Sequence, residues 1–160
     1  MSPPAKRPRP LTRGEAAFWH SLMRALVVLP RVLDDDLDRA EHLSLHEYGV
    51  LLFLSEADGQ KMRMSDLARR LSLTISGITR LVNRLVDDGL VERNRCEEDG
   101  RGFNAVLTRR GLERLERAYP AHLASARRHV IDRLTGFDLE ELSRAFMSIG
   151  EDCETSDCGE

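Results

Sequence analysis

The polar side chains best suited to chemistry lie in segment 72–89, SLTISGITRLVNRLVDDG, opposite an apolar stripe at helical spacing. Arginine can donate two hydrogen bonds to guanine or one to a phosphate, asparagine can pair with adenine, and short hydroxyls let a backbone approach DNA. The side chains predicted here to contact DNA are Thr74, Ser76, Gly77, Thr79, Arg80, Asn83 and Arg84, with Ser65 on the preceding segment. The alternative is a solvated helix face, the more common role of polar residues.

A second group suited to DNA follows at 97–102, EEDGRG, between two alternating apolar segments. Arg101 at the tip of a stiff hairpin can enter the minor groove, where the negative potential is strong. Asp99, two residues earlier, can accept a hydrogen bond from Arg101 and hold it extended. The alternative is an ordinary Asp-Gly hairpin turn with a solvated arginine.

These side chains need elements to position them, and two capping boxes mark the first helices. Thr12 and Glu15 predict the start of a helix that runs to about residue 39, and Ser44 and Glu47 predict another that ends near 58–59. Pro30 lies inside the first helix, so we expect it to kink or break there. The apolar stripe of this helix comprises Phe18, Leu22, Leu26, Leu29, Leu33 and Leu37.

The middle of the chain predicts a helix-turn-helix followed by a hairpin. An extended piece at 62–64 precedes a short helix capped by Ser65, and a turn at 71–75 leads into the DNA-facing helix, which ends at Gly89. The predicted buried side of that helix comprises Ile75, Ile78, Leu81, Val82 and Leu85. Alternation at 90–95 and 103–107 predicts the two strands. This order predicts a winged helix-turn-helix.

Two further helices complete the chain. Thr108 is predicted to cap a helix over 109–134, bent at Pro120, and Asp138 with Glu141 caps a last helix over 139–152. The fold class is therefore mainly α (α+β). A winged domain needs only about half of this chain, so the apolar stripes of the flanking helices predict a partner that covers them, most simply a second copy.

Composition is consistent with one domain or a compact dimer-forming unit. The 160 residues are 41% apolar and 32% charged, with a net charge of −3. Residues 61–110 carry 11 Lys and Arg against 7 Asp and Glu, or +4, whereas the remainder is −7. A basic middle suits phosphate binding. The basic N-terminus has no apolar region after it and no stretch approaches about 18 apolar residues, so we expect a cytoplasmic protein without a membrane segment.

As a set, six motifs resemble the MarR family of bacterial transcriptional regulators. They are LSLHEY (43–48), MSDLARRL (64–71), SGITRLVNRL (76–85), DGLVER (88–93), DGRG (99–102) and LTRRG (107–111). The resemblance implies a homodimer whose two winged domains reach one pseudo-palindromic site on double-stranded DNA. It also implies repression of transcription, in many members relieved by a small phenolic or other anionic effector or by cysteine oxidation.

The resemblance also raises the question of an effector pocket. A urate-responsive branch of the family pairs a first-helix tryptophan with an aspartate and arginines, and this chain has Trp19 with Arg80 and Arg93 as partners. Gly49 stands where that branch has an acidic residue, which argues against a urate sensor. A pocket lined by Trp19, His20 and Tyr48 is one hypothesis, and core packing of Trp19 is the other.

Other chemistries have weaker support. Cys96, Cys153 and Cys158 form no disulfide framework, which suits a reducing compartment, and Cys96 near two arginines is either a thiol of lowered pKa or an inert packing residue. His42 and His46 have the spacing of a zinc pair but straddle a helix start. We find no nucleophile elbow, phosphate loop or HExxH motif, so we expect neither an enzyme nor a cofactor.

The predicted organisation is a disordered basic arm at 1–11, a helical dimerisation region at 12–43 and 109–152, a winged helix-turn-helix at 44–108, and a flexible acidic tail at 153–160. The predicted function is a homodimeric DNA-binding regulator. The alternative is a winged-helix protein-interaction module that has lost DNA binding, for which the acidic total charge is the best argument.

Overall fold

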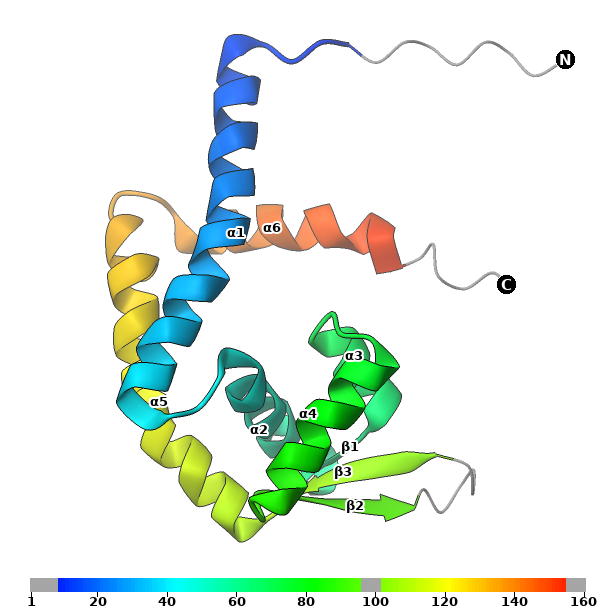
Figure 1. The fold of residues 1–160 in the computed structure, drawn as a ribbon. Coiled ribbons are helices and arrows are strands. Elements are labelled where there is room, and N and C mark those ends of the chain that lie inside the picture. Colours follow the sequence, from blue (N-terminus) through cyan, green and yellow to red (C-terminus); the bar gives the residue numbers. More distant parts are fainter. Residues whose placement is uncertain (1–8, 96–101, 155–160) are drawn as a thin grey trace, which may run out of the picture. The chain divides into compact units, whose positions relative to one another are not determined.

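The structure is a computed structural model that describes residues 9–95 and 102–154, with side chains described up to residue 149. It divides into two compact units, residues 1–122 and 123–160. The elements in chain order are α1 Arg13–Glu41, α2 Leu45–Glu56, a 3-10 turn Asp58–Gln60, β1 Lys61–Arg63, α3 Met64–Arg70, α4 Ile75–Asp87, β2 Val91–Arg95, β3 Phe103–Leu107, α5 Arg109–His129, a 3-10 turn Ile131–Arg133 and α6 Leu139–Glu154. Figure 1 shows them in sequence colours.

The capping boxes predicted for α1 and α2 are both present. The Thr12 side chain accepts a hydrogen bond from the Glu15 N–H while the Glu15 carboxylate accepts one from the Thr12 N–H, and Ser44 and Glu47 repeat the arrangement. α1 runs without interruption through Pro30, so the expected break is absent. Pro30 is exposed, which lets water solvate the carbonyl that loses its N–H partner.

Along the N-terminal part of α1, large apolar side chains face outward. Phe18 is 61% exposed, Leu26 59% and Val27 55%. An 18-residue window of α1 has a mean hydropathy of 1.2, so by length and composition alone this helix qualifies to cross a membrane. The expectation that no stretch approaches this limit was therefore wrong. An apolar helix that a second protein chain covers meets the same criterion.

The core of the first unit lies among α2, α3, α4, the sheet and the start of α5. Its fully buried members include Leu37, Val50, Leu51, Leu54, Leu67, Ile78, Val82, Leu85 and Val91. The C-terminal part of α1 joins this core through Leu37. It is also fixed to α5, because Arg114 donates hydrogen bonds to both the carboxylate and the backbone carbonyl of Glu41.

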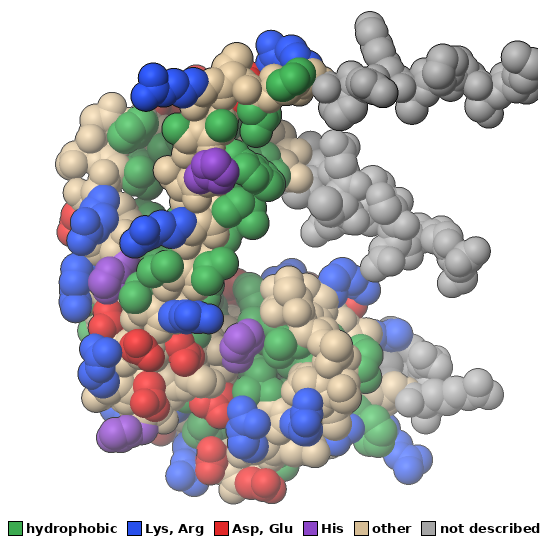
Figure 2. Space-filling view, turned by 45° about the horizontal axis from the view of Figure 1, so that its top comes forward, with side chains coloured by type: hydrophobic (Ala, Val, Ile, Leu, Met, Phe, Trp, Pro, Cys, Tyr) green, Lys and Arg blue, Asp and Glu red, His purple; other side chains and the backbone are tan. Residues whose placement is uncertain are grey.

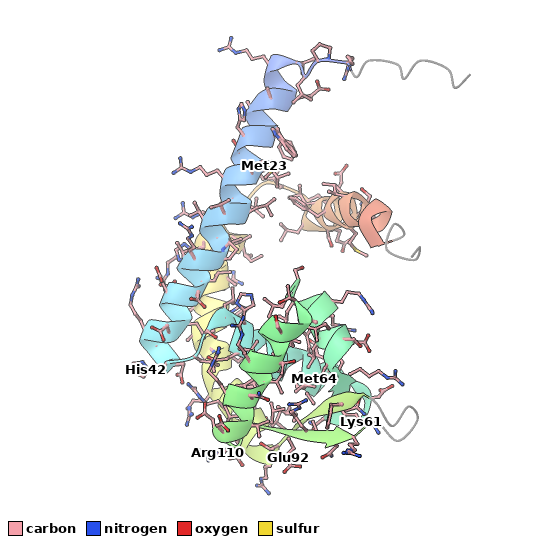
Figure 3. All side chains as sticks on the ribbon, turned by 45° about the vertical axis from the view of Figure 1, so that its right-hand side comes forward. Met23, His42, Lys61, Met64, Glu92 and Arg110 are labelled. Atoms are coloured by element: carbon pink, nitrogen blue, oxygen red, sulfur yellow. The ribbon has the colours of Figure 1, made fainter. Side chains whose placement is uncertain are left out.

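The sheet has three antiparallel strands in the order β1-β3-β2. Val91 pairs with Leu107 and Arg95 with Phe103 across the predicted hairpin. Lys61 pairs with Val106 on the other edge of β3, so the short extended piece near 62–64 is a third strand, which the sequence did not predict as part of this sheet. In Figure 3, Lys61 and Glu92 mark β1 and β2.

Three local details differ from the predictions. Ser65 does not cap α3: the N-cap is Arg63, with no side-chain hydrogen bond, and Ser65 lies exposed in the first turn. Ile75 is 59% exposed, because it is the first residue of α4 and lies beyond the core. α5 ends at His129 rather than near residue 134, and a 3-10 turn follows.

In the second unit, Asp138 caps α6 as predicted. Its Oδ1 atom accepts hydrogen bonds from the N–H groups of Glu140 (2.9 Å) and Glu141 (3.0 Å). Phe137, Phe146, Met147 and Ile149 are each more than half exposed in a single chain. This unit therefore also presents an apolar surface that the described residues do not cover.

Candidate nucleic-acid interface

The α4 helix divides into a buried apolar side and an exposed polar side. Ile78, Leu81, Val82 and Leu85 are buried, whereas Ser76, Arg80, Asn83 and Arg84 are exposed. Thr79 is half-buried, and its hydroxyl donates to the Ile75 carbonyl at 2.7 Å. Because that proton is already engaged, the Thr79 hydroxyl is free to accept a hydrogen bond rather than to donate one to a phosphate.

The N-terminal turn of α4 is built by small side chains. Thr74 is the N-cap, and its Oγ1 accepts from the Gly77 N–H at 3.1 Å. A Cβ on Gly77 would lie 3.2 Å from that same oxygen, which is a tight contact. Ser76 Oγ lies 3.2 Å from Thr74 Oγ1. Thr74 and Gly77 therefore shape the start of the helix, and Ser76 and Ile75 are the side chains it presents there.

Arg84 is held by α2. Its Nε lies 3.4 Å from Oε1 of Glu47, whose other oxygen accepts hydrogen bonds from the N–H and hydroxyl of Ser44. Burial raises the pKa of Glu47, but the Ser44 hydrogen bonds and the Arg84 guanidinium outweigh it, so the pKa is lowered overall. The carboxylate therefore stays ionised and directs Arg84 along the edge of the polar face.

Asn83 is held by the hairpin. Arg93 on β2 donates from Nη1 to Asn83 Oδ1 at 3.0 Å, and its guanidinium lies 4.6 Å from the ring centroid of Phe103 on β3. The Arg93 side chain thus links α4, β2 and β3. From the sequence, Arg93 was considered only as a partner of Trp19 and as a neighbour of Cys96, because periodicity does not show that a strand residue reaches a helix ten residues earlier.

The tip of the hairpin, residues 96–101, lies outside the described residues. The predictions for Asp99, Arg101 and Cys96 fall on this segment. The strands that carry the tip are described, and β2 follows α4 after only three residues. Gly89, with φ 70°, makes this tight connection in a backbone conformation that favours glycine.

One carbonyl group joins the end of α4, the hairpin and the start of α5. The Leu90 carbonyl accepts from the Thr108 N–H at 3.2 Å and lies 3.0 Å from the Thr108 hydroxyl, which also lies 2.9 Å from the Gly89 carbonyl. The Thr108 oxygen in turn accepts from the Gly111 N–H at 2.9 Å, the helix cap predicted for α5. This junction fixes the hairpin beside the polar face of α4.

The same overall fold is found in proteins whose structures are known. AbsC, a MarR family transcriptional regulator from Streptomyces coelicolor, is 38% identical, with a TM-score of 0.82 over 92% of this chain and 99% of that one. The chain belongs to the MarR family. Sco3205, a MarR family regulator from the same organism crystallised in complex with DNA, is 35% identical, with a TM-score of 0.86 over 96% of each chain.

Sequence comparisons agree with this assignment. The MarR family model matches residues 43–102, which span α2 to the hairpin tip. The transcriptional repressor YetL of Bacillus subtilis (strain 168) is 34% identical over 82 residues, which are 51% of this chain and 49% of YetL. The match thus spans about half the length of this curated relative.

A cavity of about 430 Å³ lies beside α4 of this MarR protein. It is lined by Asp34 of α1, Ser44 and His46 near the start of α2, Leu73 of the turn, and Gly77, Arg80, Leu81 and Arg84. The size is within the range of small-ligand sites. Two arginines and a histidine favour an anion, although Asp34 is committed to a hydrogen bond from the Leu45 N–H at 2.7 Å.

The three residues of the hypothetical pocket from sequence have different environments. Trp19 is 50% exposed and His20 is exposed, both on the N-terminal part of α1. Tyr48 is 2% exposed and stacks on the His122 ring, with ring centroids 4.3 Å apart. Within one chain the structure therefore places Tyr48 in the core and leaves the two α1 side chains on the surface.

The histidine pair weighed as a zinc site has another role at one member. His42 ends α1 in the left-handed conformation (φ 50°, ψ 49°), and its N–H donates to the Asp38 carbonyl. Across the residues with described positions, no group of three or more His, Cys, Asp or Glu side chains is placed to hold a metal ion.

Proposed function

We propose that this MarR protein is a homodimeric, sequence-specific DNA-binding regulator of transcription. The side chains that enter the major groove are Ser76, Thr79, Arg80, Asn83 and Arg84, and Arg101 reaches the minor groove. Thr74 and Gly77 form the N-terminal turn of α4, which approaches the DNA backbone. Ser65 and Asp99 flank these contacts. The winged helix-turn-helix comprises 44–108, and the dimerisation region comprises 12–43 and 109–152.

A single observation carries this proposal. The exposed side of α4 bears hydroxyls, an amide and two arginines beside a hairpin, in a chain that is 35% identical over 96% of its length to a regulator crystallised in complex with DNA. The local charge supports it, since residues 61–110 carry a net +4 in a protein of net −3. The first turns of a recognition helix are those that enter the major groove.

The apolar surface supports the dimer. The most exposed large apolar side chains of α1 are Phe18, Trp19, Leu26 and Val27, and Leu11 just before the helix is also exposed; hydrophobic side chains line this exposed face in Figure 2. A second copy would cover this surface and the exposed apolar residues of α6. The two recognition helices of this dimer would then lie about one DNA turn apart, roughly 10 base pairs. Covering α1 with protein also accounts for its hydropathy without a membrane.

Repression is the favoured direction of control, because the curated relative YetL is a transcriptional repressor. A regulator of transcription acts where the DNA is, so the proposed location is the cytoplasm. Catalysis plays no part in this proposal. The alternative, a winged-helix protein-interaction module, predicts no affinity for any duplex.

The test is to select operator fragments with the full chain from genomic DNA and measure their affinity by fluorescence anisotropy at several salt concentrations. Arg101→Ala should weaken binding and flatten the dependence of log K on log salt by about one phosphate equivalent. Arg39→Ala, at an arginine that pairs with Asp36 at the end of α1, is the matched control and should change neither. A stably monomeric protein in light scattering, or no duplex binding at low salt, contradicts the proposal.

A second function, release by an anionic effector, is favoured by the cavity of about 430 Å³ beside α4. An anion bound between Arg80 and Arg84 would withdraw both guanidinium groups from DNA. Salicylate and urate are the probes, titrated into the protein–operator complex. Release at millimolar concentration by salicylate supports an effector site, whereas unchanged affinity and unchanged Trp19 fluorescence with both compounds argue against it.

A further inference from the structure

The contact between Arg93 and Asn83 determines which atoms of the recognition face are available to DNA. An amide side chain has one accepting oxygen and one donating NH₂ group, whereas a guanidinium has donors only. The oxygen of Asn83 must therefore face Arg93, since the reversed amide would place two donors against each other. The distance of 3.0 Å from Arg93 Nη1 to Asn83 Oδ1 agrees with this orientation. The NH₂ group is then the part of Asn83 that points away from the hairpin's arginine.

Arg93 is itself constrained. Its guanidinium lies 4.6 Å from the Phe103 ring centroid, its side chain is half-buried, and its Nε atom is buried without a hydrogen-bond partner among the described residues. A buried donor without a partner costs free energy, so the other contacts of the guanidinium must offset that cost; a hydrogen bond from a charged donor, such as the one to Asn83, is about twice as strong as a neutral one. Arg95, two residues along β2, is by contrast exposed.

These two observations separate Arg93 from the arginines that can reach phosphate. Arg80 is exposed and Arg84 is 59% exposed, so their guanidinium groups are accessible to a ligand. The Arg93 guanidinium is engaged by Phe103 on one side and by Asn83 on another. Arg93 is therefore better placed to orient Asn83 than to bind a phosphate itself.

We propose that Arg93 is a positioning residue for DNA recognition, which fixes the Asn83 amide with its NH₂ group outward so that Asn83 selects a hydrogen-bond acceptor on a base edge. This proposal rests on the proposed function. In the major groove the acceptors are guanine O6 and N7, adenine N7 and thymine O4, whereas cytosine presents a donor. Asn83 therefore disfavours cytosine at the base it contacts, once in each half-site. In this proposal the hairpin contributes to specificity through Arg93 on its strand β2, in addition to the contact proposed for Arg101.

The experiment uses the full-length protein and the selected operator, with every single base-pair substitution in one half-site. Wild type, Asn83→Ala, Arg93→Ala and the double variant are compared by competition anisotropy, after circular dichroism has confirmed that each is folded. We expect both single variants to lose discrimination at the same base pair by about fivefold, which corresponds to about 1 kcal/mol. The double variant should bind like Asn83→Ala alone, because the arginine acts through the asparagine.

Asn83→Asp supplies a sharper readout. Aspartate retains an acceptor for Arg93 but presents oxygen rather than NH₂ to the base, so preference should shift at that position toward cytosine or adenine, whose N4 and N6 amino groups donate. Arg95→Ala is the matched control for lost charge on the same strand. It should leave base preferences unchanged, and any loss of affinity should be uniform across sequences and add to that of Asn83→Ala.

The outcomes separate this proposal from the proposed function. If wild type binds no duplex, the proposed function is refuted and the positioning role falls with it. If wild type binds and Arg93→Ala weakens all sequences equally, with a salt dependence flatter by about one phosphate equivalent, then Arg93 contacts the DNA backbone and only the positioning role is refuted. Additive losses in the double variant refute it as well.

Discussion

Replacing Gly111 by alanine is expected to destabilise the protein although the residue lies on a helix, where alanine is normally preferred. A Cβ at this position would overlap the Leu90 carbonyl oxygen and would also lie 3.1 Å from its carbon and 2.8 Å from Leu107 Cδ1. Leu90 is 6% exposed and Leu107 5% exposed, so neither can move aside freely. The same carbonyl accepts the hydrogen bond from the Thr108 N–H, so any displacement disturbs the junction of α4, hairpin and α5.

The magnitude follows from three contributions. Inserting a methyl group into a filled site costs about 1–3 kcal/mol. Weakening the hydrogen bond to the Leu90 carbonyl costs about 1 kcal/mol more, and the gain in helix propensity from glycine to alanine offsets at most about 1 kcal/mol. We therefore expect the free energy of unfolding to fall by about 1–3 kcal/mol, with about 2 kcal/mol as the central value. For a chain of this length the melting temperature should fall by roughly 4–8 °C.

The assay is urea unfolding followed by circular dichroism, at one fixed protein concentration because the stability of the proposed dimer would depend on concentration. Gly14→Ala is the matched control: it also lies in the first turn of a helix, but a Cβ there meets no atom within 4 Å. It should be neutral or stabilise by up to about 1 kcal/mol. If the free energy of unfolding of Gly111→Ala lies within about 0.5 kcal/mol of that of the wild type, which is roughly the effect of a neutral surface change, then the Leu90 carbonyl junction does not stabilise the fold in this way.

Three further predictions use stability measurements. His42→Gly should raise the free energy of unfolding by about 0.5–1 kcal/mol, measured in urea, because His42 ends α1 at φ 50° where glycine is unstrained. Burial lowers the pKa of His122 in the folded protein. The contribution of His122 to the free energy of unfolding is therefore full above about pH 6.5 and is lost as the pH falls through its lower pKa in the folded state. His122→Phe, which keeps the stack on Tyr48, should make the free energy of unfolding less dependent on pH between pH 7 and 5. Arg114→Met should destabilise by about 1–3 kcal/mol in thermal unfolding, because the Glu41 carbonyl and carboxylate lose a mostly buried donor; no change would mean that Arg117, 3.5 Å from that carboxylate, suffices.

Much of the fold was predictable because its determinants are local. Thr12 with Glu15 and Ser44 with Glu47 each satisfy backbone groups within four residues, so their capping boxes are visible in the sequence and present in the structure. Alternation at 90–95 and 103–107 likewise predicted the hairpin, whose strands are Val91–Arg95 and Phe103–Leu107 in the structure. The division of α4 into apolar and polar sides follows from periodicity alone, apart from Ile75 at its first turn.

The failures share a non-local cause. β1 has only three residues, and what makes it a strand is pairing with β3 more than forty residues later. The first turn of α3 needs no cap from Ser65, since its N-cap is Arg63. Pro30 does not break α1, because the cost of one proline is local, whereas the many residues on either side favour one continuous helix.

The same distinction explains what sequence reasoning found and missed at the proposed interface. The side chains that face outward on α4 are few, polar and periodic, so the sequence predicts them; the groups that hold them belong to other elements. Glu47 reaches Arg84 from α2, and Arg93 reaches Asn83 from β2. A free arginine or asparagine loses rotamer entropy when it binds a base, whereas one already oriented loses less. If α4 binds DNA as proposed, we expect these supports to affect affinity and specificity without touching DNA, so a regulator with the same α4 surface but a different residue at position 93 should select different operators.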